Sequence, residues 1–400
     1  MITRLVMAKA VGCRHASMFL AAVMLAGGIS NGAPAPISTT IPVGDGPVAI
    51  AIDQRARIVF VVNVRGDSVS LIDARTRQLM RTIQVGQLPH DVAVNARTGV
   101  AYVADWLSDT ISIIEPGASD ARAIPVNGYR PGPLAVAISA TTERVFVTNA
   151  LGNSLAVVGQ PSANSFSINV PVGEDPHPVV VDDRNRRVYV GNALDETVSV
   201  IDLDTATLVK AVHVGEHPIG LAVDGRRHRL YVANSASDTV SVLSSPDAEV
   251  VATIPVGRTP RVMVNHPAAG VFYVANQEGA SVTTIDSATL TPVSTTTVGN
   301  APLVMALDER RGRLYTANAI DGTVSVIDTF SMTVLATLPV GRYPDAIAVE
   351  SRSGCVYVGN ALSNDVSIVA CDGALSRATV GPPVGGDTEL NGSGRRIELA

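Results

Sequence analysis

Eight copies of a short pattern, an aromatic residue followed three positions later by Asn or once by Asp, extend along almost the whole chain. Neighbouring copies are 42 to 44 residues apart. A fixed period in this range is the signature of a repeat architecture, in which each repeat is one supersecondary unit that stacks on the next. The aromatic positions are Phe60, Tyr102, Phe146, Tyr189, Tyr231, Tyr273, Tyr315 and Tyr357.

Each repeat predicts four short β-strands. In one repeat the segments 178–182, 187–191, 197–201 and 208–214 are apolar or alternate apolar with polar residues, and polar turns separate them. Such segments predict strands, and no part of the repeat has helical periodicity. Four-stranded antiparallel units repeated radially are the blades of a β-propeller. Because eight second strands and eight third strands can be counted, we predict an all-β propeller of eight blades, with seven as the alternative.

The repeat also resembles a known family. The Tyr-Val-x-Asn motif, the Val-Ser-Val-Ile-Asp strand and the Val-Gly-x-x-Pro link between blades are similar to those of the YVTN family of β-propeller repeat proteins. That resemblance implies an exported or surface protein, usually with seven blades, and some members bind single-stranded DNA. The eight repeats counted here depart from the family's usual number.

The chain is expected to contain a signal peptide at 1–33, one propeller domain at 37–381 and a disordered tail at 382–400. Arg4, Lys9 and Arg14 flank an apolar run at 16–29 that is too short to span a bilayer. We therefore expect export to the periplasm or the extracellular space, with no membrane span after cleavage. An uncleaved anchor is the alternative. Segment 37–43 or segment 375–380 would supply the last strand that closes the ring.

The charge balance restricts the partners. The formal net charge is −6, and a nucleic-acid surface needs a basic patch, so nucleic acid is an unlikely partner. Single-stranded DNA binding is kept as a minor alternative because the family resemblance allows it. We expect a monomer whose partner is an unknown small molecule or protein.

Two cysteines of the last repeat are expected to form a disulfide. A hairpin centred on Ser363 would place Tyr357 opposite Val369 and Cys355 opposite Cys371. Directly opposed Cβ atoms in an antiparallel pair lie within about 5 Å, close to disulfide range. Free buried thiols are the alternative.

The residue after the link proline is apolar in odd repeats and ionisable in even repeats. In a closed ring of eight, the four ionisable residues would lie about a quarter-turn apart around the mouth of the central channel. Ionisable groups at such a place are candidates for a site. They are His90, His177, Arg261 and Asp345.

The second repeat adds further candidates. It contains the only Trp of the chain, an Asp in place of the motif Asn, and an expanded link to the third repeat. An aromatic platform with acids, a His and an Arg could hold a polar small molecule or a partner's side chain. A Trp packed on a loop for structural reasons is the alternative. The added candidates are Asp91, Asp105, Trp106, Tyr129 and Arg130.

No motif for a cofactor, a metal or a catalytic nucleophile is present, so we assign no catalytic residue, no metal ligand and no cofactor. This favours a binding or scaffold protein over an enzyme. The alternative is a periplasmic lactonase- or lyase-type enzyme, as some related propellers are, with His90 or His177 as general base. An accessory role beside a redox enzyme is a further alternative.

Overall fold

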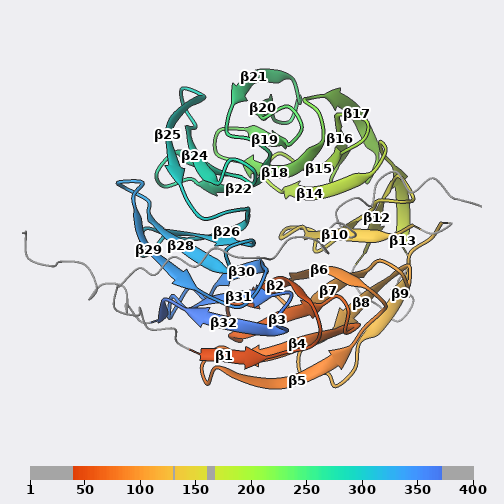
Figure 1. Ribbon diagram of the computed structural model, residues 1–400. Helices are drawn as coiled ribbons and strands as arrows, with labels where there is room; N and C mark the ends of the chain where they lie inside the picture. The colour runs from red at the N-terminus through yellow and green to blue at the C-terminus, as the bar shows by residue number, and fades with distance from the viewer. Residues whose placement is uncertain (1–38, 129–130, 160–166, 372–400) are drawn as a thin grey trace, which may run out of the picture.

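The protein is an eight-bladed β-propeller (Figure 1). The structure, a computed structural model, describes residues 39–128, 131–159 and 167–371, and thirty-two strands in these ranges form eight four-stranded antiparallel sheets. The predicted fold and number of blades are thus confirmed. No helix in the described ranges is long and apolar enough to cross a membrane.

Blades 1 to 7 each contain four consecutive strands, from the innermost to the outermost. The first four are β2 (Pro47–Asp53), β3 (Ile58–Asn63), β4 (Ser68–Asp73), β5 (Gln78–Gln84); β6 (Pro89–Val94), β7 (Ala101–Asp105), β8 (Thr110–Ile114), β9 (Arg122–Pro125); β10 (Pro133–Ile138), β11 (Val145–Asn149), β12 (Ser154–Val158), β13 (Ser167–Pro171); and β14 (Pro176–Asp182), β15 (Arg187–Asn192), β16 (Thr197–Asp202), β17 (Leu208–His213). The next three are β18 (Pro218–Asp224), β19 (Arg229–Asn234), β20 (Thr239–Ser244), β21 (Val250–Pro255); β22 (Pro260–His266), β23 (Val271–Asn276), β24 (Ser281–Asp286), β25 (Thr291–Thr297); and β26 (Pro302–Asp308), β27 (Arg313–Asn318), β28 (Thr323–Asp328), β29 (Val334–Pro339).

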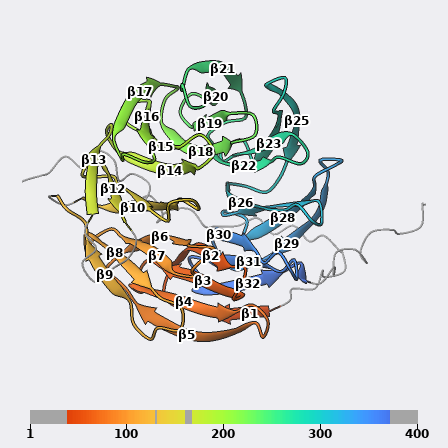
Figure 2. The same cartoon turned by 180° about the vertical axis from the view of Figure 1, so that it is seen from behind.

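Blade 8 joins the two ends of the chain. Its strands β30 (Pro344–Val349), β31 (Val356–Asn360) and β32 (Asp365–Val369) are followed outward by β1 (Thr39–Pro42), which pairs antiparallel with β32. The N-terminal segment therefore supplies the closing strand, and the competing segment 375–380 lies outside the described residues. The innermost strands of neighbouring blades contact each other all round the ring, including β30 with β2 (Figure 2).

The repeated aromatic residues form the core between blades. Tyr102 on β7 packs in one cluster with Val145 and Val147 of the next blade, and the other motif aromatics are buried in the same way. Because an aromatic side chain buries a large apolar area, one such residue per repeat gives each interface between blades a hydrophobic centre. The period of the sequence is thus the period of the packing.

The motif Asn ties the second strand to the third. The side-chain amide of Asn276 donates to Ser281 Oγ at 3.1 Å and to Thr283 Oγ1 at 2.9 Å, and most other blades repeat this pair of bonds. The glycine of the Val-Gly-x-x-Pro link lies against the same amide. A Cβ placed on Gly257 would lie 2.6 Å from Asn276 Nδ2, so this position needs glycine.

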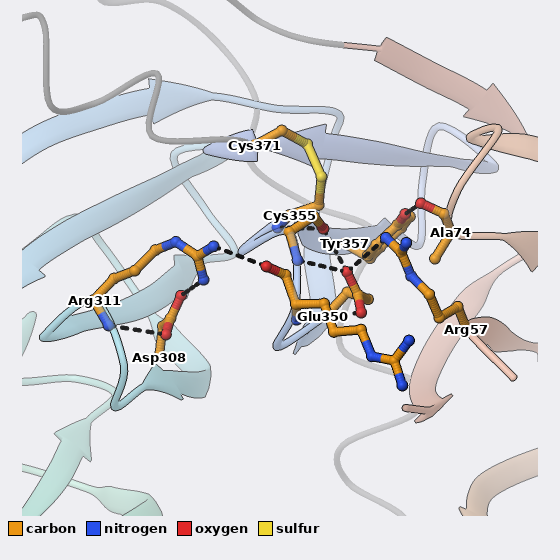
Figure 3. Close-up of a disulfide and its surroundings, with 10 residues drawn as sticks. Arg57, Ala74, Asp308, Arg311, Glu350, Cys355, Tyr357 and Cys371 are labelled. Atoms are coloured by element: carbon orange, nitrogen blue, oxygen red, sulfur yellow. Dashed lines mark hydrogen bonds and ion pairs between the residues drawn. A yellow bond between two sulfur atoms is a disulfide. The ribbon is translucent and has the colours of Figure 1, made fainter. Parts of the chain in front are cut away.

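The predicted disulfide between Cys355 and Cys371 is present (Figure 3). The predicted register was wrong by one residue, because β31 and β32 pair Tyr357 with Ile368. Continuing that register would place Ala370 opposite Cys355. Ala370 has a φ of 58°, and this left-handed turn at the end of β32 brings Cys371 to Cys355 in its place.

Two faces of the ring can be distinguished. We call the entry face the side that holds the link prolines and the loops between second and third strands. We call the hairpin face the opposite side, which holds the turns between first and second strands and between third and fourth strands. The strand directions place the described residues among the predicted site residues on the entry face.

Candidate functional site

The four ionisable residues of the predicted ring lie in β-bulges. In blade 2 the ladder pairs Pro89 with Asp105 and then Asp91 with Ala104, so His90 is the extra residue between two paired positions. The same irregularity surrounds His177, Arg261 and Asp345. A bulge bends the strand and redirects the side chain of the extra residue, and bulges are frequent beside functional sites. The link proline with its bulge thus gives every blade one side chain that lies outside the regular ladder.

The causes of the pKa shifts group these residues in two pairs. Burial lowers the pKa of His90, and the positive charge of His177 lowers it further. Burial raises the pKa of Asp345 to about 6, while Arg261 opposes that rise. Each pair therefore contains two side chains from alternate blades that lie within range of each other's field.

Two residues that sequence reasoning did not select belong to the Arg261 and Asp345 pair. Burial, and next the charge of Asp345, raise the pKa of the Tyr343 phenol to about 12, whereas Arg261 opposes the shift. Gln277 accepts a long hydrogen bond of 3.5 Å from Arg261 Nη1. The position of Tyr343, directly before the link proline of blade 8, was the only available signal for its role.

The candidate residues of blade 2 have different surroundings. The rings of His90 and Trp106 lie 5.5 Å apart between centroids. Asp91 accepts backbone N–H bonds from Val92 at 2.8 Å and from Val136 at 2.9 Å, so its carboxylate joins two neighbouring innermost strands. Burial raises its pKa to about 6.

Asp105 is an internal residue of the blade. Its side chain is fully buried, and its Oδ2 accepts bonds from Thr110 Oγ1 at 2.8 Å and Ser112 Oγ at 2.7 Å. It thus occupies the place of the motif Asn, with the hydroxyls as donors, and burial raises its pKa to about 6. Tyr129 and Arg130 lie outside the described residues.

A second pair of imidazoles lies across the boundary between blades 4 and 5. His177 Nε2 lies 3.2 Å from Asp175 Oδ1, and its ring centroid is 6.4 Å from that of His217. His217 Nδ1 lies 2.9 Å from Ser235 Oγ, while this hydroxyl donates to the backbone carbonyl of His217 at 3.0 Å. Ser235 has one proton for these two acceptors, so the donor between Nδ1 and Oγ depends on the tautomer of His217. The contact with Ser235 holds the ring of His217 in place.

No group of three or more His, Cys, Asp or Glu side chains within the described ranges is arranged to hold a metal ion. The entry face offers a cation at Arg261 and a carboxyl group at Asp345 in blades 6 and 8. It offers the imidazoles of His90 and His177 in blades 2 and 4. Such a set can hydrogen-bond and pair with a polar molecule that carries charged groups.

The protonation of His90 can be read from Trp106, the sole Trp of the chain. An imidazolium quenches indole fluorescence on contact, so we expect the emission to fall on acidification with a midpoint below 6.5, the ordinary pKa of histidine. Substitution His177→Gln should move the midpoint upward, because a neighbouring positive charge is removed. Substitution His90→Gln is the control and should abolish the transition. A midpoint that His177→Gln leaves unchanged would show that the two histidines do not interact.

Comparison with known proteins gives the fold and no closer relationship. No protein-family model and no curated protein sequence matches the chain. Among solved structures, hydrazine synthase of Kuenenia stuttgartiensis is similar with a TM-score of 0.57 and 17% identity, over 82% of this chain and 96% of that chain. A functionally unknown protein of Desulfotomaculum acetoxidans is similar with a TM-score of 0.57 and 16% identity, over 76% and 99%. The dihydro-heme d1 dehydrogenase NirN, in complex with DHE, is similar with a TM-score of 0.63 and 16% identity, over 74% and 66%. At these identities the likeness extends to the fold alone.

Proposed function

We propose that this protein is an exported binding protein whose ring of His90, His177, Arg261 and Asp345 recognises a polar, charged small molecule or partner side chain on the entry face. The observation that carries the proposal is the position of these four residues in the bulges that follow the link prolines, with His90 against Trp106. The directions of the pKa shifts support it, since His177 acts on His90 and Arg261 acts on Asp345.

The ring also suggests which chemistry the ligand carries. Arg261 offers a fixed fork of N–H donors, and Asp345 beside it offers acceptors. Because the pKa of His90 lies below 6.5, its imidazole is neutral at pH 7 and offers one donor and one acceptor. We therefore propose a ligand with at least one anionic group, which would lie on Arg261, and further hydroxyl or amino groups directed at the imidazoles.

Export and family membership are parts of the same proposal. The disulfide supports export, because disulfides persist in oxidising compartments. The eightfold motif and the apolar run near the N-terminus support a place among YVTN-type propellers. We propose a monomer, since one chain closes the ring by itself.

The test is a fluorescence titration. Trp106 lies against His90, so a ligand at the ring should shift its emission. The chain would be titrated with amino acids, hydroxy acids, sugar acids and phosphorylated sugars at pH 7. We expect a saturable shift with at least one class, weakened about tenfold or more by Arg261→Gln, as loss of a charged hydrogen bond predicts.

The control variant is Asp321→Asn, on the loop of blade 7 on the same face, where the carboxylate accepts bonds from Asn300. It should leave the titration unchanged. A shift that survives both Arg261→Gln and His177→Ala would place the ligand elsewhere and reject the ring as the site.

An enzyme is the second candidate. His177 with Asp175 at 3.2 Å has the form of a general base with the carboxylate that orients it, and His90 has the lowered pKa that a neutral base needs. Two of the structural neighbours are enzymes by title. Turnover of a bound lactone that falls with acidification and is lost in His177→Ala, with binding retained, would favour this candidate.

A further inference from the structure

The outermost strands begin on the hairpin face with exposed aliphatic residues in five of the blades. The outermost strands of propellers face solvent, where single apolar residues need no explanation. Exposed aliphatic residues that recur at the same position in several blades do need an explanation. Three blades have pairs, Leu79 and Met80 in β5, Leu208 and Val209 in β17, and Val250 and Val251 in β21, and two have single residues, Val293 in β25 and Val334 in β29, with exposed fractions of 37% to 58%.

Blade 1 alone combines these apolar residues with arginines. Its outer hairpin reads Asp73-Ala-Arg-Thr-Arg-Gln-Leu-Met-Arg81. The equivalent hairpin of blade 4 carries Asp204 and Lys210, and that of blade 5 carries Asp247 and Glu249. Those of blades 6 and 7 carry no basic residue between the third strand and the exposed aliphatic residue. The charges of blade 1 are therefore not a requirement of the hairpin. We call the blade 1 patch the set Arg75, Leu79, Met80 and Arg81.

The positive charge of the patch is largely uncompensated. Arg81 Nη1 donates to the carbonyl oxygen of Gly117 at 3.2 Å. A carbonyl oxygen satisfies a donor but carries no net charge. Arg75 lies 3.4 Å from Asp73, and its side chain is 67% exposed, so this pair is weak.

The chain enters the fold beside this patch. Thr39 pairs with Ile368, near the end of β32 that lies on the hairpin face, and β1 lies against β5 (Figure 1). The apolar run at 16–29, which the sequence assigns to membrane targeting, precedes Thr39 by nine residues.

We propose that the blade 1 patch docks the propeller on an anionic lipid surface. Exposed aliphatic side chains that enter the headgroup region, together with arginines that attract anionic lipids, are the two contributions that peripheral membrane binding needs. Docking by the hairpin face leaves the entry face, with its ring of ionisable residues, open to the solution.

The test is co-sedimentation with vesicles, using the chain from Pro34 onward, which retains every described residue. We expect binding to phosphatidylglycerol-containing vesicles that weakens with salt, and little binding to pure phosphatidylcholine. The double variant Arg75→Gln with Arg81→Gln should bind about 25-fold more weakly, at about fivefold for each arginine. The double variant Leu79→Ser with Met80→Ser should bind about tenfold more weakly.

The matched control is Leu208→Ser with Val209→Ser, which removes aliphatic residues at the same repeat position in the outer hairpin of blade 4 and should leave binding unchanged. All these side chains are exposed or half-buried, so the fold should survive, which thermal unfolding checks. Equal binding to neutral vesicles, or wild-type binding by both blade 1 variants, overturns the proposal. Tight heparin binding that Leu79→Ser with Met80→Ser does not change, without vesicle binding, would assign the patch to a soluble polyanion instead.

Discussion

Replacing Cys355 and Cys371 by serine should lower the free energy of unfolding by about 3 kcal/mol. The two cysteines are 16 residues apart in sequence, and a disulfide that closes a loop of this length restricts the unfolded chain by about that amount. Both side chains are buried in the cluster that joins blade 8 to blade 1, so the loss occurs where the ring closes. Urea denaturation of the wild type and the double variant measures the difference.

Around this disulfide the two ends of the chain are also joined by the pairing of β1 with β32 and by ion pairs and hydrogen bonds between blades. Arg57 of blade 1 pairs at 3.0 Å with the fully buried Glu350 of blade 8, and Arg311 of blade 7 bonds the same turn (Figure 3). The double variant should therefore lose hydrogen-exchange protection first in β1, β31 and β32. Reductant should destabilise the wild type but not the variant. Equal denaturation midpoints for the oxidised wild type and the variant would refute a stabilising role.

Substituting Asn for Asp105 should stabilise the protein by about 3 kcal/mol above pH 7. Burial raises the pKa of Asp105 from 3.8 to about 6, and each unit of pKa corresponds to about 1.4 kcal/mol. Asn at this position makes the bonds of the other blades without a buried charge.

The sign of the pH dependence follows from the direction of the shift. A carboxyl group whose pKa is higher in the folded protein destabilises it as pH rises from 3.8 through about 6, because the unfolded chain ionises first. The advantage of Asp105→Asn should therefore vanish near pH 3.5 and reach its full size above pH 7. Thermal or urea unfolding at the two pH values measures it. A variant that is less stable than the wild type at pH 8 would show that the charge is needed.

The fold could be predicted from the sequence because the same local pattern occurs in eight repeats. The aromatic core position recurs in every repeat, as does a hydroxyl that bonds the motif Asn or Asp, and an aspartate closes the outer hairpin in four blades. Asp202 Oδ1, for example, accepts the backbone N–H groups of Asp204 and Thr205 at 3.0 Å. The disulfide could be predicted for the same reason, since both cysteines depart from the repeat within one blade.

The details that the repeat does not encode escaped prediction. The one-residue error in the register of blade 8 arose because the backbone turn at Ala370 leaves no signal in the pattern. Asp105 was selected as an exception to the motif, yet its side chain lies inside the blade. A carboxylate can accept bonds from the same hydroxyls to which the amide of Asn donates in the other blades. Tyr343 was not selected, since its proximity to Arg261 and Asp345 depends on the arrangement of blades 6 and 8 in space.

The most direct test of the proposed site compares the low-mass compounds that the wild type and the ring variants retain. Wild type, Arg261→Gln, His177→Ala and the control Asp321→Asn would each be equilibrated with the same periplasmic extract and separated by rapid gel filtration, and the retained compounds would be identified by mass spectrometry. The proposal predicts at least one anionic compound on the wild type and on Asp321→Asn that is absent from both ring variants. Retention of the same compounds by all four proteins, or of none by the wild type, would contradict the proposal.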